Sequence, residues 1–138
     1  MWVLCERRHF RDPDGQAASV SALRGDLGFH LSAHEAAQVA ASHNVHLYVE
    51  HDRFNAQRHR ENAAANRAFQ HAVAEHRAIE EAGLRPSRPT PQAPREKAPL
   101  SLDQFLAYRA SHGSYVVIEA VQILAATDRT ATDTEAVA

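Results

Sequence analysis

The chain has 138 residues, enough for one domain or for one small domain with an appendage. It has one Cys and no apolar stretch of the ~18 residues that a membrane span needs, which argues against disulfide frameworks, four-Cys metal sites and membrane proteins. The formal net charge of −2 leaves no overall positive charge to hold nucleic acid. The single Cys favours a reducing compartment, so we expect a cytoplasmic protein, or part of a particle assembled in the cytoplasm.

Proline marks the clearest boundary along the chain. Residues 85–99 contain five Pro, and because Pro fixes φ and lacks an N–H, we expect an extended, polyproline-like linker there. This linker separates a helix-rich α+β module, residues 1–84, from a short C-terminal unit, residues 100–126. The polar tail 127–138 is expected to be flexible. Residues 51–95 contain eight Arg and five acidic residues, so the middle of the chain is basic.

The first 25 residues predict a strand, a turn and a short helix. The apolar run Trp2–Cys5 is typical of a strand. Residues 12–15 read Asp-Pro-Asp-Gly, a turn sequence in which Pro presets φ and Gly tolerates positive φ. We interpret Ala17–Arg24 as a short helix that Gly25 stops.

A capping sequence predicts the start of the next helix. Ser32 to Glu35 fits a capping box, in which the Ser side chain caps the first turn and Glu reaches back. We expect this Ala-rich helix to end near His43, with Asn44 as its left-handed C-terminal residue. Val45–Glu50 then alternates apolar and polar residues, which is the strand period.

The longest predicted element is a helix over about Asp52–Ala82. Its first half, around residues 57–62, is polar on every side and is expected to face solvent or a polar partner. Its second half is amphipathic, with a heptad-like apolar stripe. We predict an oligomer seam on this stripe, formed by Ala65, Phe69, Ala72 and Ile79. The expected fold is mostly α (α+β), with a small sheet from Trp2–Cys5 and Val45–Glu50 packed under this helix.

The C-terminal unit is predicted to be a helical hairpin. Ser101 to Gln104 forms a second capping box, and Tyr115–Ala126 is interpreted as a helix, with a strand as the alternative because Tyr and Val favour sheets. A unit this short and apolar cannot bury itself, so it must dock on the first module, a sister subunit or a foreign partner. The residues predicted to bind the partner are Leu102, Phe105, Leu106, Val117, Val121 and Leu124.

The ten His suggest a metal site, but their spacing does not support one. On a helix, His59, His71 and His76 point in three different directions. We therefore expect no metal and no other cofactor. Titration of these His near neutral pH leaves pH sensing open.

Two His-x-Ser motifs resemble those of the 2H phosphoesterases. They are Phe29-His30-Leu-Ser32-Ala33 and Ser111-His112-Gly-Ser114. The resemblance implies that each His acts as acid or base and each hydroxyl holds phosphate. A phosphoesterase or a metal-dependent enzyme is our third functional hypothesis.

Residues Leu31–Ala41 resemble the first helix of excisionase-like DNA-binding regulators. The resemblance implies a helix-turn-helix within residues 31–67, with a recognition helix for the major groove. The Arg residues that follow are candidates for phosphate contacts. These candidates are Arg53, Arg58, Arg60 and Arg67.

The favoured hypothesis is a non-catalytic protein–protein interaction or assembly protein. An amphipathic half-helix, a long tether and an apolar C-terminal unit are typical of chains that bind another chain. The partner is expected to be another protein or a second copy. A structural or assembly component of a phage-like particle is one specific form of this hypothesis, and a small DNA-binding regulator is the alternative.

Overall fold

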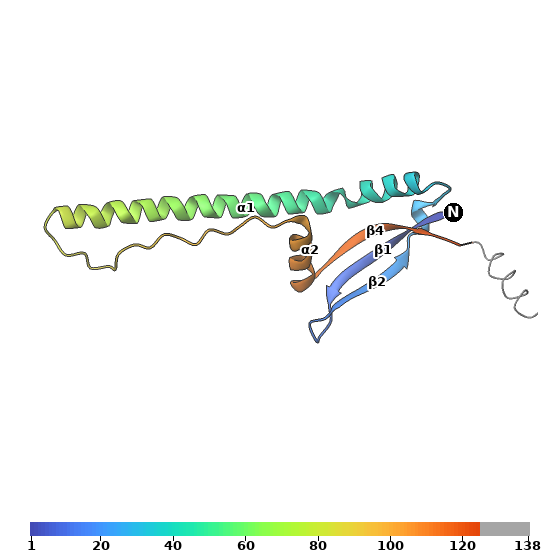
Figure 1. The fold of residues 1–138 in the computed structure, drawn as a ribbon, viewed down its shortest axis with the longest axis horizontal. Coiled ribbons are helices and arrows are strands. Elements are labelled where there is room, and N and C mark those ends of the chain that lie inside the picture. Colours follow the sequence, from blue (N-terminus) through green and yellow to red (C-terminus); the bar gives the residue numbers. More distant parts are fainter. Residues whose placement is uncertain (125–138) are drawn as a thin grey trace, which may run out of the picture. The chain divides into compact units, whose positions relative to one another are not determined.

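A computed structural model describes residues 1–124 of the chain. It confirms a mixed α+β fold, with one long helix, one short helix and a small antiparallel sheet (Figure 1). Two predicted regions lie outside the described residues: the tail, 127–138, and the end of the C-terminal unit, 125–126. In chain order the elements are β1 (Trp2–Arg11), β2 (Ala17–Leu23), the 3-10 turn η1 (Gly25–Leu27), β3 (Phe29–His30), α1 (Ala33–Glu81), α2 (Leu102–Ser111) and β4 (Ser114–Gln122).

The contacts divide the chain into two compact units. The first, here called the sheet unit, contains Met1–Tyr48 together with the described part of Asp103–Ala138. The second, here called the arm, is Val49–Leu102. Helix α1 contributes its first part to the sheet unit and the rest to the arm.

Strand β1 lies at the centre of the sheet. All its partners are antiparallel: β2 and the short β3 follow each other along one side, and β4 lies along the other. Strand β4 pairs with nearly the whole of β1, from Trp2 opposite Gln122 to Phe10 opposite Ser114. The sheet therefore has two long edges, one formed by β2 and the other by β4.

The predicted turn at residues 12–15 is confirmed and closes the β1–β2 hairpin. The carboxylate of Asp12 accepts the N–H groups of Asp14 (3.0 Å) and Gln16 (2.8 Å), and Gly15 takes the positive φ of 80° that the turn requires. The predicted helix at Ala17–Arg24 is wrong, since Ala17–Leu23 form β2. A segment this short gains little from one or two helical turns, whereas the hairpin supplies β1 as a ladder partner.

The core of the sheet unit is small. Leu4 of β1 and Ile118 of β4 are buried against Ala36 and Ala40 of α1. Two Ala on one side of the helix allow its backbone to approach the sheet closely. Burial of a Leu side chain such as Leu4 contributes roughly 1.5–3 kcal/mol.

Capping confirms the predicted start of α1. The N–H of Glu35 donates to the Ser32 hydroxyl at 3.0 Å. The helix ends at Glu81, and Gly83 follows with a φ of 73°, which allows the N–H of Leu84 to reach the carbonyl of Ile79 at 3.1 Å. This Schellman motif turns the chain back along the helix.

The predicted helix end at Asn44 and the predicted strand Val45–Glu50 are wrong, since α1 continues through both. Alternation over six residues is also compatible with one turn of helix, and here the helix buries Leu47 while Val45 stays exposed. The Asn44 side chain does not end the helix; it bonds to β4 instead.

The predicted C-terminal hairpin of two helices is wrong. The helix expected after the second capping box is present as α2, but residues 114–122 form β4, the alternative that the Tyr-Val-Val-Ile run favoured. Strand β1 offers this segment a partner along its whole length, which a lone apolar helix would lack.

Candidate interaction surfaces

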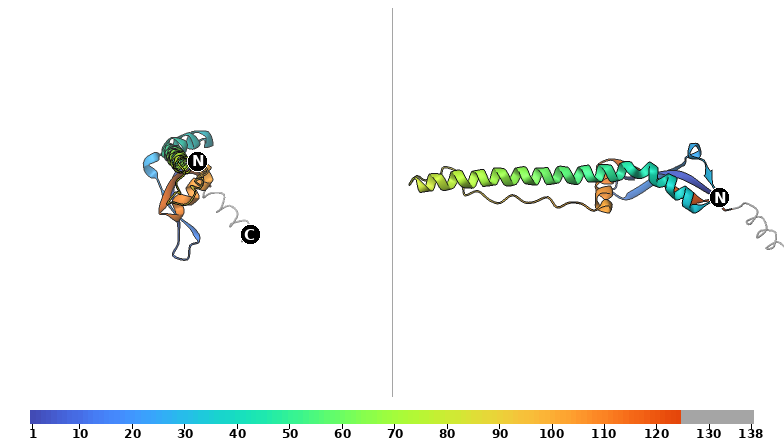
Figure 2. Two further views of the ribbon diagram at one scale, coloured as in Figure 1. Left: turned by 90° about the vertical axis from the view of Figure 1, so that its left-hand side faces the viewer. Right: turned by 90° about the horizontal axis from the view of Figure 1, so that it is seen from above.

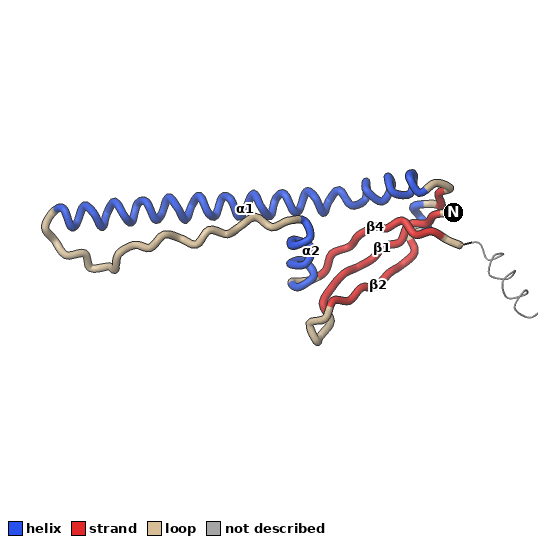
Figure 3. Tube along the Cα trace, in the orientation of Figure 1, coloured by secondary structure: helices blue, strands red, loops and turns tan. Residues whose placement is uncertain are grey.

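In the arm, the Pro-rich residues run antiparallel to α1 and contain neither helix nor strand (Figures 2 and 3). We call residues 85–100 the strap. Because the strap lacks regular structure, its backbone groups need other hydrogen-bond partners. Helix α1 supplies several of them.

Asn55 binds the backbone of Leu100 at two points. Its Oδ1 accepts the Leu100 N–H at 2.9 Å, and its Nδ2 donates to the Leu100 carbonyl at 2.9 Å. The His51 ring nitrogen lies 2.6 Å from the same carbonyl. The carboxamide thus pairs with a backbone residue as a neighbouring strand would.

Asn62 repeats this arrangement at Lys97. Its Oδ1 accepts the Lys97 N–H and its Nδ2 donates to the Lys97 carbonyl, both at 2.9 Å. The Lys97 ammonium lies 2.7 Å from the Glu61 carboxylate, and its hydrogen bond lowers the pKa of Glu61. Arg58 donates to the Ala98 carbonyl at 3.0 Å. One polar side of the helix therefore holds three strap residues, Lys97, Ala98 and Leu100.

We call the Asn55–Leu100 and Asn62–Lys97 contacts the two clamps. Their spacing along the helix matches their spacing along the strap. From Asn55 to Asn62 the helix rises about 10.5 Å, and from Leu100 to Lys97 a polyproline chain covers about 9 Å. Phe69 lies seven residues further along the helix and Pro94 three residues further along the strap, and both are half-buried.

The predicted oligomer seam lies partly beneath the strap. Beyond Phe69, an apolar hollow of about 670 Å³ separates α1 from the strap and is lined by Ala72, His76 and Ile79 on the helix and by Pro86, Pro89 and Pro91 among the strap residues. Ile79 remains 38% exposed. The fourth seam residue, Ala65, is half-buried on the same helix. The chain therefore covers part of this stripe itself and leaves a hollow at its end.

The predicted phosphate-binding Arg residues do not form a cluster. Arg58 lies over the Phe54 ring, 4.9 Å from its centroid, and is used to hold the strap. Arg60 donates to Gln57 at 2.7 Å. Arg53 and Arg67 are exposed.

The helix-turn-helix interpretation is wrong, because residues 33–81 form one continuous helix without a turn. DNA binding by another geometry stays a prediction.

Three of the six predicted partner-binding residues are covered within the sheet unit, and Leu102 belongs to the arm. Phe105 is 2% exposed, so its side chain is already covered. Three others are half-buried, namely Leu102, Leu106 and Val117, whereas Val121 and Leu124 are 39% and 79% exposed. The sequence left three docking options for this segment: the first module, a sister subunit or a foreign partner. Strand β4 docks on the first module, because it pairs with β1 of its own chain.

The two His-x-Ser motifs lie at opposite ends of β1. His30 is opposite Trp2, and Ser114 is opposite Phe10, so about 26 Å of strand separates them. The rings are also occupied locally, since His30 Nε2 lies 3.1 Å from the Leu27 carbonyl. The phosphoesterase interpretation is contradicted, because these motifs cannot share one site.

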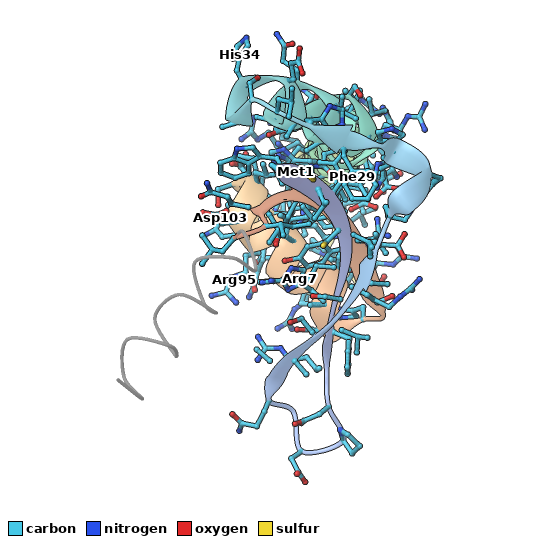
Figure 4. All side chains as sticks on the ribbon, turned by 90° about the vertical axis from the view of Figure 1, so that its right-hand side faces the viewer. Met1, Arg7, Phe29, His34, Arg95 and Asp103 are labelled. Carbon is cyan, nitrogen blue, oxygen red and sulfur yellow. The ribbon has the colours of Figure 1, made fainter. Side chains whose placement is uncertain are left out.

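The other His are similarly dispersed. His34, for example, points away from the sheet at the start of α1 (Figure 4). Among residues 1–124, no three His, Cys, Asp or Glu side chains converge as metal ligands would. None of the helices in this part of the chain combines the length and apolarity of a membrane span.

The residues with the most specific contacts are Asn44, Asn55 and Asn62. The sequence analysis gave Asn44 a different role, as a helix end, and did not identify Asn55 or Asn62. Asn is a poor helix former and is unusual inside a long helix. The spacing of seven between Asn55 and Asn62, opposite a Pro-rich segment, was the available signal.

Comparison with protein families, with curated protein sequences and with solved structures gives no match to this chain.

Proposed function

We propose that the chain is a non-catalytic protein–protein interaction or assembly protein that docks another protein along its arm. The observation that carries this proposal is the absence of a core in the arm: no residue of Val49–Leu102 is buried. Hydrogen bonds from α1 side chains to the strap backbone nevertheless join the two segments of this unit.

The energetics of ordering support the proposal. Fixing the backbone costs roughly 1–2 kcal/mol per residue, and most proteins offset this cost by burying apolar surface. The arm contains half-buried apolar groups on its strap side but encloses none of them. A partner that covers the arm would bury the area that the arm alone leaves in water.

The hollow beyond Phe69 is the part of the arm best suited to this role. Ala72, Ile79 and three Pro rings give the hollow a mainly apolar lining, although Glu75 and Arg88 also border it. Ile79 keeps more than a third of its surface exposed. An apolar side chain from a partner protein fits this chemistry, as do the apolar anchors of other interfaces.

The phage-like form of the hypothesis receives no additional support. It depended on residues 85–99 being a long tether and on the tail, 127–138, which lies outside the described residues. Residues of the first segment lie along α1. The class proposed here is therefore the general one, a protein that binds another protein.

The test is a comparison of proteins that co-purify with three full-length chains at equal expression. These are the wild type, Ile79→Asp in the hollow, and Ala74→Asp, an exposed, charge-matched control on the same helix. We expect the wild type and A74D to retain a partner, and I79D to recover at least tenfold less of that partner. Retention by all three chains, or recovery of no partner by any, would refute docking at the hollow.

A further inference from the structure

The two edges of the sheet are treated differently. At the β4 edge, Asn44 of α1 donates to the Ile118 carbonyl at 2.9 Å and accepts the Ile118 N–H at 2.8 Å. This contact occupies the middle of the edge with a side chain. The β2 edge has no equivalent contact, since β2 pairs only with β1 among the described residues.

The pairing pattern shows which β2 groups face outward. The N–H of Arg24 donates to the Leu4 carbonyl at 2.8 Å, which assigns the even-numbered residues of β2 to the ladder with β1. The backbone groups of the odd-numbered residues therefore point away from the sheet. These residues are Ala17, Ser19, Ser21 and Leu23.

Natural edge strands are usually protected by charges, by Pro, by bulges or by a covering element. Strand β2 reads Ala-Ala-Ser-Val-Ser-Ala-Leu and contains no charged residue and no Pro. Every residue except Ala18 is exposed, and Val20 and Leu23 are 61% and 60% exposed. A strand with these properties is suited to pairing with another strand.

The sequence of β2 also indicates which strand could pair with this edge. Residues 18–22 read Ala-Ser-Val-Ser-Ala, the same in both directions around Val20. A twofold axis at Val20 would place Ala18 opposite Ala22, Ser19 opposite Ser21 and Val20 opposite Val20 of the second copy. The odd-numbered residues of the two strands would then face each other with their free backbone groups, as an isologous interface requires.

We propose that β2 pairs antiparallel with β2 of a second copy of this chain, on a twofold axis at Val20, so that the two sheets become continuous. The cross-strand pairs contain no like charges, and two β-branched side chains meet at the axis. Only seven residues of each chain take part, so the interface is small and its dissociation constant is expected to be micromolar or weaker. This proposal does not depend on the arm.

A cysteine at the axis gives a direct test. Residues directly opposite in a non-hydrogen-bonded pair have Cβ atoms roughly 4.5 Å apart, which is within reach of a disulfide. In the Cys5→Ser background, we expect oxidised V20C to form a covalent dimer. The background is needed because Cys5 is opposite Leu23 in the same chain.

The matched control is L23C in the same background. In the proposed register, Leu23 is opposite Ala17 of the second copy, and the two Leu23 residues lie about 20 Å apart. We expect at least tenfold less covalent dimer from L23C than from V20C. Equal yields, or a V20C chain that stays monomeric, would overturn the proposed register.

Sedimentation equilibrium of the full chain tests the pairing without oxidation. Val20→Lys places two ammonium groups at the axis, and Val20→Thr preserves a β-branched side chain there. We expect V20K to raise the dimer dissociation constant at least tenfold and V20T to change it less than threefold. Ser19→Pro removes an outward N–H without touching the ladder with β1, and it should act like V20K.

The outcomes also separate this proposal from docking along the arm. A wild-type chain that is monomeric up to millimolar concentration overturns β2 pairing and leaves the arm proposal standing. A dimer that V20K does not weaken overturns it as well. If I79D loses the co-purified partner but the V20C cross-link still forms in the I79D chain, β2 pairing is supported. That result also shows that β2 pairing does not depend on the arm.

Discussion

Two clamps on a Pro-rich segment lead to a prediction about individual amide protons. In an extended segment without secondary structure, backbone N–H groups normally exchange rapidly with solvent. In the strap, the Leu100 N–H donates to Asn55 and the Lys97 N–H donates to Asn62. We therefore expect slow exchange at these positions and rapid exchange at Ala98, between them.

The perturbation is Asn55→Ala, which removes both hydrogen bonds between the Asn55 carboxamide and the backbone of Leu100, a half-buried residue. A net contribution of about 0.5–1.5 kcal/mol per hydrogen bond gives about 1–3 kcal/mol for the pair, or about a 5- to 150-fold faster exchange at Leu100. Because the clamps are separate, Lys97 should accelerate less. Asn62→Ala should produce the reverse pattern.

The assay is amide hydrogen exchange followed residue by residue by NMR, with Asn66→Ala as an exposed Asn control on the same helix. Protection factors for Lys97 and Leu100 that match that of Ala98 in the wild type would refute the clamps. Equal acceleration at both sites in N55A would show that the strap detaches as one piece.

Three other substitutions test the fold and its pH dependence. Asn44→Ala leaves the Ile118 backbone groups without their side-chain partner and should lower the free energy of unfolding by about 1–3 kcal/mol in urea, while Asn66→Ala leaves it unchanged. Gly83→Ala forces a Cβ onto a residue with φ of 73° and should cost about 1 kcal/mol in the same assay, although nothing lies within 4 Å of that Cβ. Burial raises the pKa of Tyr115, so the folded state binds this proton more tightly than the unfolded state, and stability is present below pH ~10 and falls as pH rises above it. Tyr115→Phe should remove this part of the alkaline loss, and an unchanged pH profile would contradict the assignment.

The sequence predicted best those features that depend on local chemistry. The Asp-Pro-Asp-Gly turn and the Ser32 cap are determined by side chains within four residues of each other, and both are confirmed. The class, α+β with a small sheet and a long helix, is confirmed as well.

Features that depend on distant partners were predicted poorly. Ala17–Leu23 and Ser114–Gln122 are strands because β1 lies between them, which no local window contains. Val45–Glu50 has the strand period, but it continues a helix already begun at Ala33. In each case tertiary pairing or helix continuation outweighed a short periodic pattern.

The candidate surfaces show the same division. The stripe through Phe69 and Ile79 was identified from its spacing, but periodicity could not show that the chain's own strap covers part of it. The polar half of the helix was expected to face solvent or a polar partner. That partner is the backbone of residues 97–100, which has no side-chain signature.

The clamps also determine which substitutions the chain can accept. Asn55 and Asn62 bind the N–H and carbonyl groups of Leu100 and Lys97, groups that every residue except Pro presents. Most residue types can therefore replace these two strap residues without loss of the clamps. Pro is the exception, and the five Pro of this segment occupy neither position. Homologous chains can thus diverge in most of the strap while retaining two amides on the helix and two positions free of Pro.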